Sequence, residues 1–150
     1  MTTLTPSPTT DTNAQSQNEQ LWHRASAFLY EARVDEYLDC WHESGRYEVA
    51  YPIGEFPASV SGKPAIGELF AGFGAAAESI SVEGVRFHQT TDPDVAFVEE
   101  TMTAELRGGG TYVNRLAMRV TFRDGLIAEV FEYYGEQAHE GLLRRLGLVA

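Results

Sequence analysis

DGLIAEVFEYYGEQAHEGLLRRLG, residues Asp124 to Gly147, is the stretch of sequence that decides the fold. Its opening Asp-Gly predicts a turn, and the nine residues that follow are rich in β-branched and aromatic types, which predicts a strand. The rest of the stretch predicts a short final helix. Since alternate side chains of a strand share a face, both faces of this strand are apolar and each carries one carboxylate. One face holds Leu126, Ala128, Val130, Glu132 and Tyr134, and the other holds Ile127, Glu129, Phe131 and Tyr133.

A strand that is apolar on both faces is expected to lie centrally in its fold, covered on both sides. A carboxylate held in such a place must find a partner, shift its pKa or take part in chemistry. Glu132 and Glu129 are therefore the first candidates for a functional group.

Three more long strands are predicted before the final one, at about 81–90, 95–106 and 111–122. Turn signals separate them, TDPD at 91–94 and GGG at 108–110, so the strands form antiparallel hairpins. Alternation along 111–122 places its arginines on the outer side. The same alternation leaves two polar residues, Asn114 and Glu100, on the inner side. Glu99 and Glu105 are expected to share the outer side with the arginines and to form cross-strand pairs.

The first half of the domain predicts three helices and one strand. Apolar residues recur at helical spacing from Glu19 to Leu29, and again from Val34 to Trp41. Ser44-Gly45 then breaks helicity, and a strand is expected from Arg46 to Tyr51. The segment SGKPAIGELFAGF predicts the third helix, with Pro64 in its first turn. Helices first and an antiparallel meander afterwards predict a segregated α+β fold, in which the helices close one face of a curved sheet.

Length and composition limit the possibilities further. One hundred and fifty residues predict a single domain, 19–150, preceded by a disordered tail, 1–18, which is polar and has almost nothing to bury. Twenty-two acidic against 11 basic side chains give a net charge of −11, which disfavours nucleic acid and anionic membrane surfaces as partners. With one cysteine and no signal peptide or membrane-spanning segment in the sequence, we expect a cytoplasmic protein.

Several strings, in this order, resemble the SnoaL-like family of the nuclear-transport-factor-2-like superfamily, which contains ketosteroid isomerases and polyketide cyclases. They are SGKPAIGELF, FHQTTDPDVAFVE, DGLIAEVFEYYGE and GLLRRLG. The resemblance covers about residues 19–148 and implies a cone-shaped α+β fold. It also implies a homodimer, in agreement with the apolar row Ile127, Phe131 and Tyr133, which is too large to leave in water.

The resemblance implies that Glu132 matches the acid/base residue of SnoaL-type cyclases. The ketosteroid-isomerase pattern is not kept, because the position of its base aspartate is occupied by Tyr51, before Pro52, and the position of its oxyanion tyrosine falls near Ala25. Steroid isomerisation by that set of residues is therefore not expected.

Each candidate has a structural as well as a functional interpretation. Glu132 is either an acid/base with a raised pKa or a carboxylate paired with Arg115 or tyrosine hydroxyls. The other candidates for substrate contact could equally pack or satisfy backbone groups: Asn114, Tyr134, Tyr51, Tyr37, His88 and Glu100. Cys40 is expected to be a small core residue, and the four histidines lack the spacing of a metal site.

The resulting hypothesis is a cofactor-independent cyclase or isomerase that acts on a hydrophobic, carbonyl-containing, polyketide-like secondary metabolite, with Glu132 as the acid/base. The alternative is a non-catalytic domain of the same fold that binds a small hydrophobic molecule or dimerises. An open cavity with Glu132 facing it would favour the enzyme, whereas a cone filled by aromatic side chains would favour the alternative.

Overall fold

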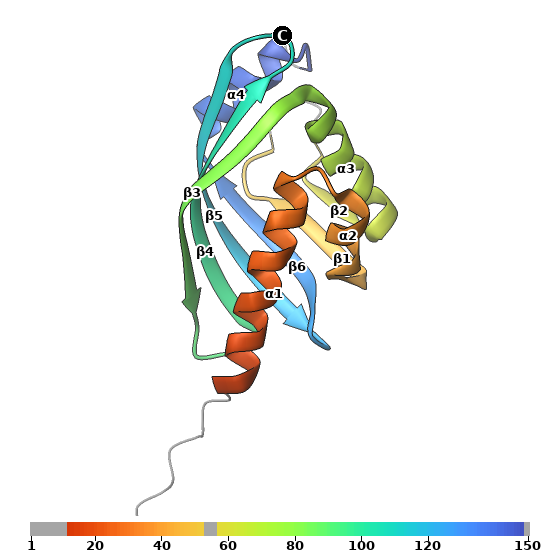
Figure 1. The fold of residues 1–150 in the computed structure, drawn as a ribbon, viewed down its shortest axis with the longest axis vertical. Coiled ribbons are helices and arrows are strands. Elements are labelled where there is room, and N and C mark those ends of the chain that lie inside the picture. The colour runs from red at the N-terminus through yellow and green to blue at the C-terminus, as the bar shows by residue number, and fades with distance from the viewer. Residues whose placement is uncertain (1–11, 53–56, 149–150) are drawn as a thin grey trace, which may run out of the picture.

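The computed structural model describes residues 12–52 and 57–148 of the chain. Within this part, helices α1 to α3 lie on one side of a curved sheet and α4 lies at one end (Figure 1). This arrangement is the segregated α+β fold that the sequence predicts, with helices closing one face of a curved sheet. The elements in chain order are α1 (Thr12–Tyr30), α2 (Val34–Asp39), β1 (Trp41–Val49), β2 (Ser59–Ser61), α3 (Lys63–Ala76), β3 (Ala77–Gln89), β4 (Val95–Leu106), β5 (Thr111–Arg123), β6 (Leu126–Tyr134) and α4 (Glu136–Arg145).

The sheet has the strand order β2-β1-β6-β5-β4-β3. All neighbouring strands are antiparallel except β1 and β6, which pair in parallel. Strand β6 therefore lies between β1 and β5, in the central position that its two apolar faces predict.

The alternation predicted for β4 and β5 is confirmed along both strands. Inner positions are buried from Tyr112 to Phe122 on β5 and from Ala96 to Leu106 on β4, while the outer positions are exposed or half-buried. Asn114 and Glu100 are buried on the inner side, as the pattern indicates, each with 3% of its surface exposed.

The start of β1 differs from the prediction. The second helix ends at Asp39, and Trp41 is the first residue of β1. Trp41 pairs with Ile127 of β6, and the Ile127 amide donates to the carbonyl of the preceding residue, Cys40, at 2.9 Å. Ser44-Gly45 lies inside the strand, in an irregularity between Trp41 and Arg46. A side chain at Gly45 would lie 2.7 Å from the Trp41 ring, so this close approach requires glycine. The strand ends at Val49 rather than Tyr51.

A second difference concerns Ile127. The pairing of β5 with β6 skips Ala128, since Thr121 faces Glu129 and Phe122 faces Ile127. This bulge reverses the alternation, and Ile127 is fully buried in the core instead of standing in an outer apolar row.

The start of the domain also differs from the prediction. Helix α1 begins at Thr12, so the predicted tail boundary at residue 18 falls inside the helix. Asn18 is buried, and its side-chain amide donates to the Pro93 carbonyl at 3.0 Å, which anchors this end of the helix to the β3–β4 turn. Residues 1–11 of the predicted tail lie outside the described residues.

Candidate functional site

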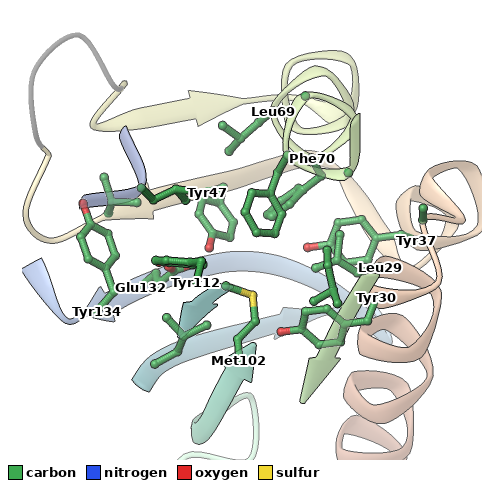
Figure 2. A pocket seen from close by; sticks show the side chains of 18 of the residues that line it. Leu29, Tyr30, Tyr37, Tyr47, Leu69, Phe70, Met102, Tyr112, Glu132 and Tyr134 are labelled. Atoms are coloured by element: carbon green, nitrogen blue, oxygen red, sulfur yellow. The ribbon is translucent and has the colours of Figure 1, made fainter. Parts of the chain in front are cut away.

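A cavity of about 600 Å³ lies between the helices and the inner face of the sheet. Its size falls in the usual range for small-molecule sites. The walls are mainly apolar and aromatic, with residues from α1, α2, α3, five strands and the C-terminal segment, and Figure 2 shows many of these side chains. The aromatic residues that line it are Trp22, Tyr30, Tyr37, Tyr47, Phe70, Phe73, Tyr112 and Tyr134.

Glu132, on β6, lines this cavity. The side chain is enclosed by protein, and the part of its surface that remains open faces the cavity. Among the residues that the structure describes, no side chain donates a hydrogen bond or forms an ion pair with the Glu132 carboxylate. Loss of hydration therefore raises the pKa of Glu132 to about 8. The predicted partner Arg115 lies exposed on the opposite face of the sheet.

The other candidate carboxylate of β6, Glu129, lies on the outer face. Its Oε1 accepts a hydrogen bond from Arg119 Nη2 at 3.0 Å. The two glutamates of the final strand thus occupy chemically different places, since Glu129 is paired near solvent and Glu132 lies in the cavity with no partner among the described residues.

A tyrosine and a buried glutamate form a second polar feature of the wall. The Tyr30 hydroxyl, at the end of α1, donates to Glu100 Oε1 on β4. Glu100 Oε2 is buried and has no hydrogen-bond partner among the described residues. Burial raises the pKa of Glu100, and the hydrogen bond from Tyr30 opposes this change. Burial also raises the pKa of Tyr30, as do the charges of Glu100 and, to a smaller extent, Glu132.

Asn114 holds the end of the sheet to the start of α4. Its Oδ1 accepts the Gly135 amide at 2.8 Å, and its Nδ2 donates to the Tyr112 hydroxyl at 2.7 Å. A side chain at Gly135 would lie 2.7 Å from Asn114 Oδ1, so glycine is needed at this junction.

The structure therefore divides the predicted substrate contacts into two groups. Tyr37 and Tyr134 line the cavity together with Glu132. Four others lie outside its lining: Asn114 satisfies the backbone of Gly135, Glu100 lies behind Tyr30, the Tyr51 side chain is 52% exposed, and His88 is exposed. The Tyr51 carbonyl accepts the Tyr134 hydroxyl.

His88, one of the candidates for substrate contact, is not among the residues that line the cavity. It lies on the outer side of β3, where its Nε2 is 2.6 Å from Glu99 Oε2. Glu99 is therefore paired with a histidine rather than with an arginine of β5, and Glu105 accepts from the Thr111 hydroxyl.

Three lining tyrosines were missed by the sequence reasoning: Tyr30, Tyr47 and Tyr112. The strand pattern places Tyr112 on the inner face beside Asn114, so alternation could have identified it. For Tyr30, at the last position of α1, the sequence carries no such signal, because its contact with Glu100 joins residues 70 positions apart.

Two kinds of site are not found among the described residues. No group of three or more His, Cys, Asp or Glu side chains is placed to hold a metal ion in this part of the chain. Likewise, none of its helices is both long enough and apolar enough to cross a membrane.

Comparison with known proteins identifies the family. The sequence profile of the SnoaL-like domain matches residues 22–130. No match was found among curated proteins.

Solved structures show the same fold at low sequence identity. A provisionally assigned isomerase from Bacillus subtilis superposes with a TM-score of 0.81 at 16% identity, over 91% of this chain and 97% of the other. A phenazine biosynthesis-related protein from Pseudomonas aeruginosa gives 0.73 at 15%, over 98% and 91%. A Mycobacterium tuberculosis protein in complex with estradiol-17beta-hemisuccinate gives 0.70 at 16%, over 81% and 96%. At these identities the similarity shows the fold alone.

Proposed function

This chain belongs to the SnoaL-like domain family of the nuclear-transport-factor-2-like superfamily, and we propose that it is a cofactor-independent isomerase or cyclase. Its substrate is a hydrophobic, carbonyl-containing, polyketide-like secondary metabolite, and Glu132 is the general acid/base.

The carboxylate of Glu132, which lies in an apolar cavity and has no partner among the described residues, is the observation that carries this proposal. A carboxylate whose pKa is about 8 is poised to take and return a proton near neutral pH. Burying a carboxylate without a partner destabilises a fold, and such groups concentrate at functional sites. Distant relatives that share the fold include proteins of secondary-metabolite biosynthesis, which supports the substrate class.

The reaction follows from the place of this carboxylate. Ionised Glu132 takes a proton from a carbon next to the substrate carbonyl, and the electron pair of the broken C–H bond moves onto the carbonyl oxygen to give an enolate. In an isomerase, protonated Glu132 returns the proton to a different carbon of the conjugated system. In a cyclase, the enolate carbon attacks a second carbonyl of the same molecule, and Glu132 supplies the proton to the resulting alkoxide.

The charged residues of the cavity lining indicate the charge of the substrate. Glu68 and Glu132 are the carboxylates among its described lining residues, and no Lys, Arg or His side chain is found in that set. An anionic ligand would therefore meet like charge without a compensating cation. The proposed substrate is uncharged.

Binding without chemistry is the second candidate. The mainly apolar lining supports it, because such a cavity can hold a hydrophobic molecule by exclusion of water alone. One relative of the same fold was solved with a steroid ester. The two functions differ in whether Glu132 must titrate.

Exchange of acidic C–H protons tests the proposal without knowledge of the natural substrate. We expect the protein to speed the exchange of the α-protons of 2-tetralone with deuterium from D₂O, followed by NMR. Glu132→Gln keeps the shape but cannot take the proton, so the catalysed rate should fall by about 10²–10⁴.

Glu129→Gln is the matched control, since it makes the same change three residues away on the outer face and should alter the rate little. If Glu129→Gln abolishes exchange while Glu132→Gln does not, the assignment of the acid/base is wrong. If 2-tetralone binds but neither variant changes its exchange, the cavity binds without catalysis.

A further inference from the structure

Two cavity tyrosines have the direction of their hydrogen bonds set by the protein, and the directions are opposite. We propose that Tyr30 accepts a hydrogen bond from a hydroxyl group of the ligand, whereas Tyr112 donates one to a ligand carbonyl. The cavity would then select an uncharged hydroxy ketone. This assignment rests on the proposed function in taking the cavity as the substrate site, and it adds the functional groups that the substrate carries.

The direction at Tyr112 follows from a chain of contacts through Asn114. The Gly135 amide can only donate, so the atom of Asn114 that lies 2.8 Å from it must be the side-chain oxygen. The amide nitrogen of Asn114 therefore faces the Tyr112 hydroxyl at 2.7 Å and donates to it. Because one lone pair of that oxygen is occupied and no described residue accepts its proton, the hydroxyl proton of Tyr112 is available to a ligand.

The direction at Tyr30 is the reverse. Its proton goes to Glu100 Oε1, and Glu100 is not among the residues that line the cavity. The lone pairs of the Tyr30 oxygen remain, and donation of its proton to Glu100 strengthens them as acceptors. A ligand group that meets Tyr30 must therefore bring a proton of its own, as a hydroxyl does.

The two tyrosines lie apart, which separates the two ligand groups. In Figure 2, Tyr30 lies beside Tyr37 at one end of the view, whereas Tyr112 lies toward the other end with Glu132 and Tyr134. They also come from different elements, Tyr30 from the end of α1 and Tyr112 from the start of β5. The carbonyl is thus expected in the half of the cavity that holds Glu132, and the hydroxyl in the other half.

Matched aromatic probes test this assignment by binding alone, measured by calorimetry. The probe that fits is 6-acetyl-2-naphthol, which carries a hydroxyl and a ketone on opposite ends of a rigid apolar ring system. Its methyl ether, 2-acetyl-6-methoxynaphthalene, lacks the hydroxyl proton, and 6-isopropenyl-2-naphthol replaces the carbonyl oxygen by a methylene of similar size.

The wild-type protein should bind the hydroxy ketone about tenfold more tightly than either analogue, the usual worth of one well-placed hydrogen bond to a polar partner in a buried site. Tyr30→Phe should abolish the preference for the hydroxyl but keep the preference for the ketone. Tyr112→Phe should do the opposite, so each variant serves as the control for the other.

Tyr30→Phe leaves Glu100 buried without a partner and could lower stability. The double variant Tyr30→Phe/Glu100→Leu removes both members of the pair and should show the same loss of hydroxyl preference in a stable protein. Equal binding of all three probes by the wild type, or a Tyr30→Phe protein that still prefers the hydroxyl, would overturn the assignment. The assignment would also be overturned if Tyr30→Phe lost the preference for the ketone and Tyr112→Phe lost the preference for the hydroxyl.

These outcomes are separate from those of the proposed function. If the probes show the crossed pattern but Glu132→Gln retains full proton exchange, the hydroxy ketone assignment stands and the catalytic role of Glu132 fails. If Glu132→Gln loses exchange while the crossed pattern is absent, only the assignment of the two tyrosines fails.

Discussion

A buried carboxylate makes the stability of this protein depend on pH in a particular direction. Folding raises the pKa of Glu132 from 4.5 to about 8, so between these values the folded protein binds more protons at this site than the unfolded chain does. The free energy of unfolding therefore falls as pH rises through this window. Below pH 4.5 Glu132 does not lower the free energy of unfolding through its charge, because the carboxyl is neutral in both states. Above pH 8 it is ionised in both states, and the full loss of unfolding free energy is present.

Glu132→Gln should remove this cost. We expect the variant to melt at a higher temperature than the wild type at pH 9, by at least about 3 °C, since roughly 1 kcal/mol corresponds to 2–4 °C in a domain of this size. The difference should shrink toward pH 5. Scanning calorimetry across this range measures it, and a constant difference at all pH values would show that Glu132 does not titrate in this window. The other ionisable groups of the described cavity lining, Glu68 and the tyrosines, are present in both proteins, as is Glu100 next to Tyr30.

At the scale of single residues, strand alternation predicted which way a side chain points but not what it meets. It placed Glu132 and Asn114 on the inner face, and both are there. Whether an inward polar residue reaches the cavity depends on partners from distant parts of the chain. The Asn114 side chain is hydrogen-bonded to Gly135, and Glu100 is hydrogen-bonded to Tyr30. No local pattern in the sequence indicates these two contacts.

The junction between β5 and α4 depends on one side chain. Asn114 is buried and bonds to both Gly135 and Tyr112. Asn114→Ala would leave the Gly135 amide without its acceptor, so the free energy of unfolding should fall by about 1–3 kcal/mol in urea titrations. Hydrogen exchange should rise first in α4, because this residue ties the start of that helix to the sheet.

Arg115→Ala is the control for this prediction, because Arg115 is the exposed neighbour on the same strand and should change stability by less than about 0.5 kcal/mol. Gly135→Ala should act like Asn114→Ala, since its added methyl group would collide with the Asn114 oxygen. An Asn114→Ala protein with unchanged stability and unchanged exchange in α4 would contradict the role assigned to this side chain.

At the scale of elements, the local patterns predicted β4, β5 and β6 well and β1 poorly. Strands of a hairpin follow each other in the chain, so the turn and the alternation of side chains predict both their pairing and their inner face. Strand β1 instead pairs in parallel with β6, more than 80 residues away, and this pairing draws Trp41 out of a helical pattern. The Ala128 bulge is of the same kind, because it is a property of the pairing between β5 and β6 and not of either strand.

At the scale of the whole molecule, the outer face of the sheet carries exposed aromatic side chains that have no part in the cavity. Phe97, Arg119 and Phe131 face one another across β4, β5 and β6, and Tyr133 lies in the next row, in ring contact with Phe131 at 5.0 Å. Phe97 is 40% exposed and Tyr133 is 36% exposed. The Arg119 guanidinium lies over the Phe131 ring, 5.1 Å from its centroid, and pairs with Glu129. This is an aromatic surface in which Arg119 is already paired with Glu129, which favours contact with another protein surface over water.

We expect a second copy of the chain to cover this face, giving a homodimer. An isologous contact would place the same aromatic row on both sides. Light scattering at micromolar concentration should therefore give twice the 16.6 kDa of the monomer.

Tyr133→Lys places a charge in the aromatic row and should shift the mass to that of the monomer. The control is Glu31→Lys, a change at an exposed residue after α1, which should leave the dimer intact. A wild-type protein that remains at 16.6 kDa would rule out the dimer, and a dimer that persists in Tyr133→Lys would move the contact to a different face.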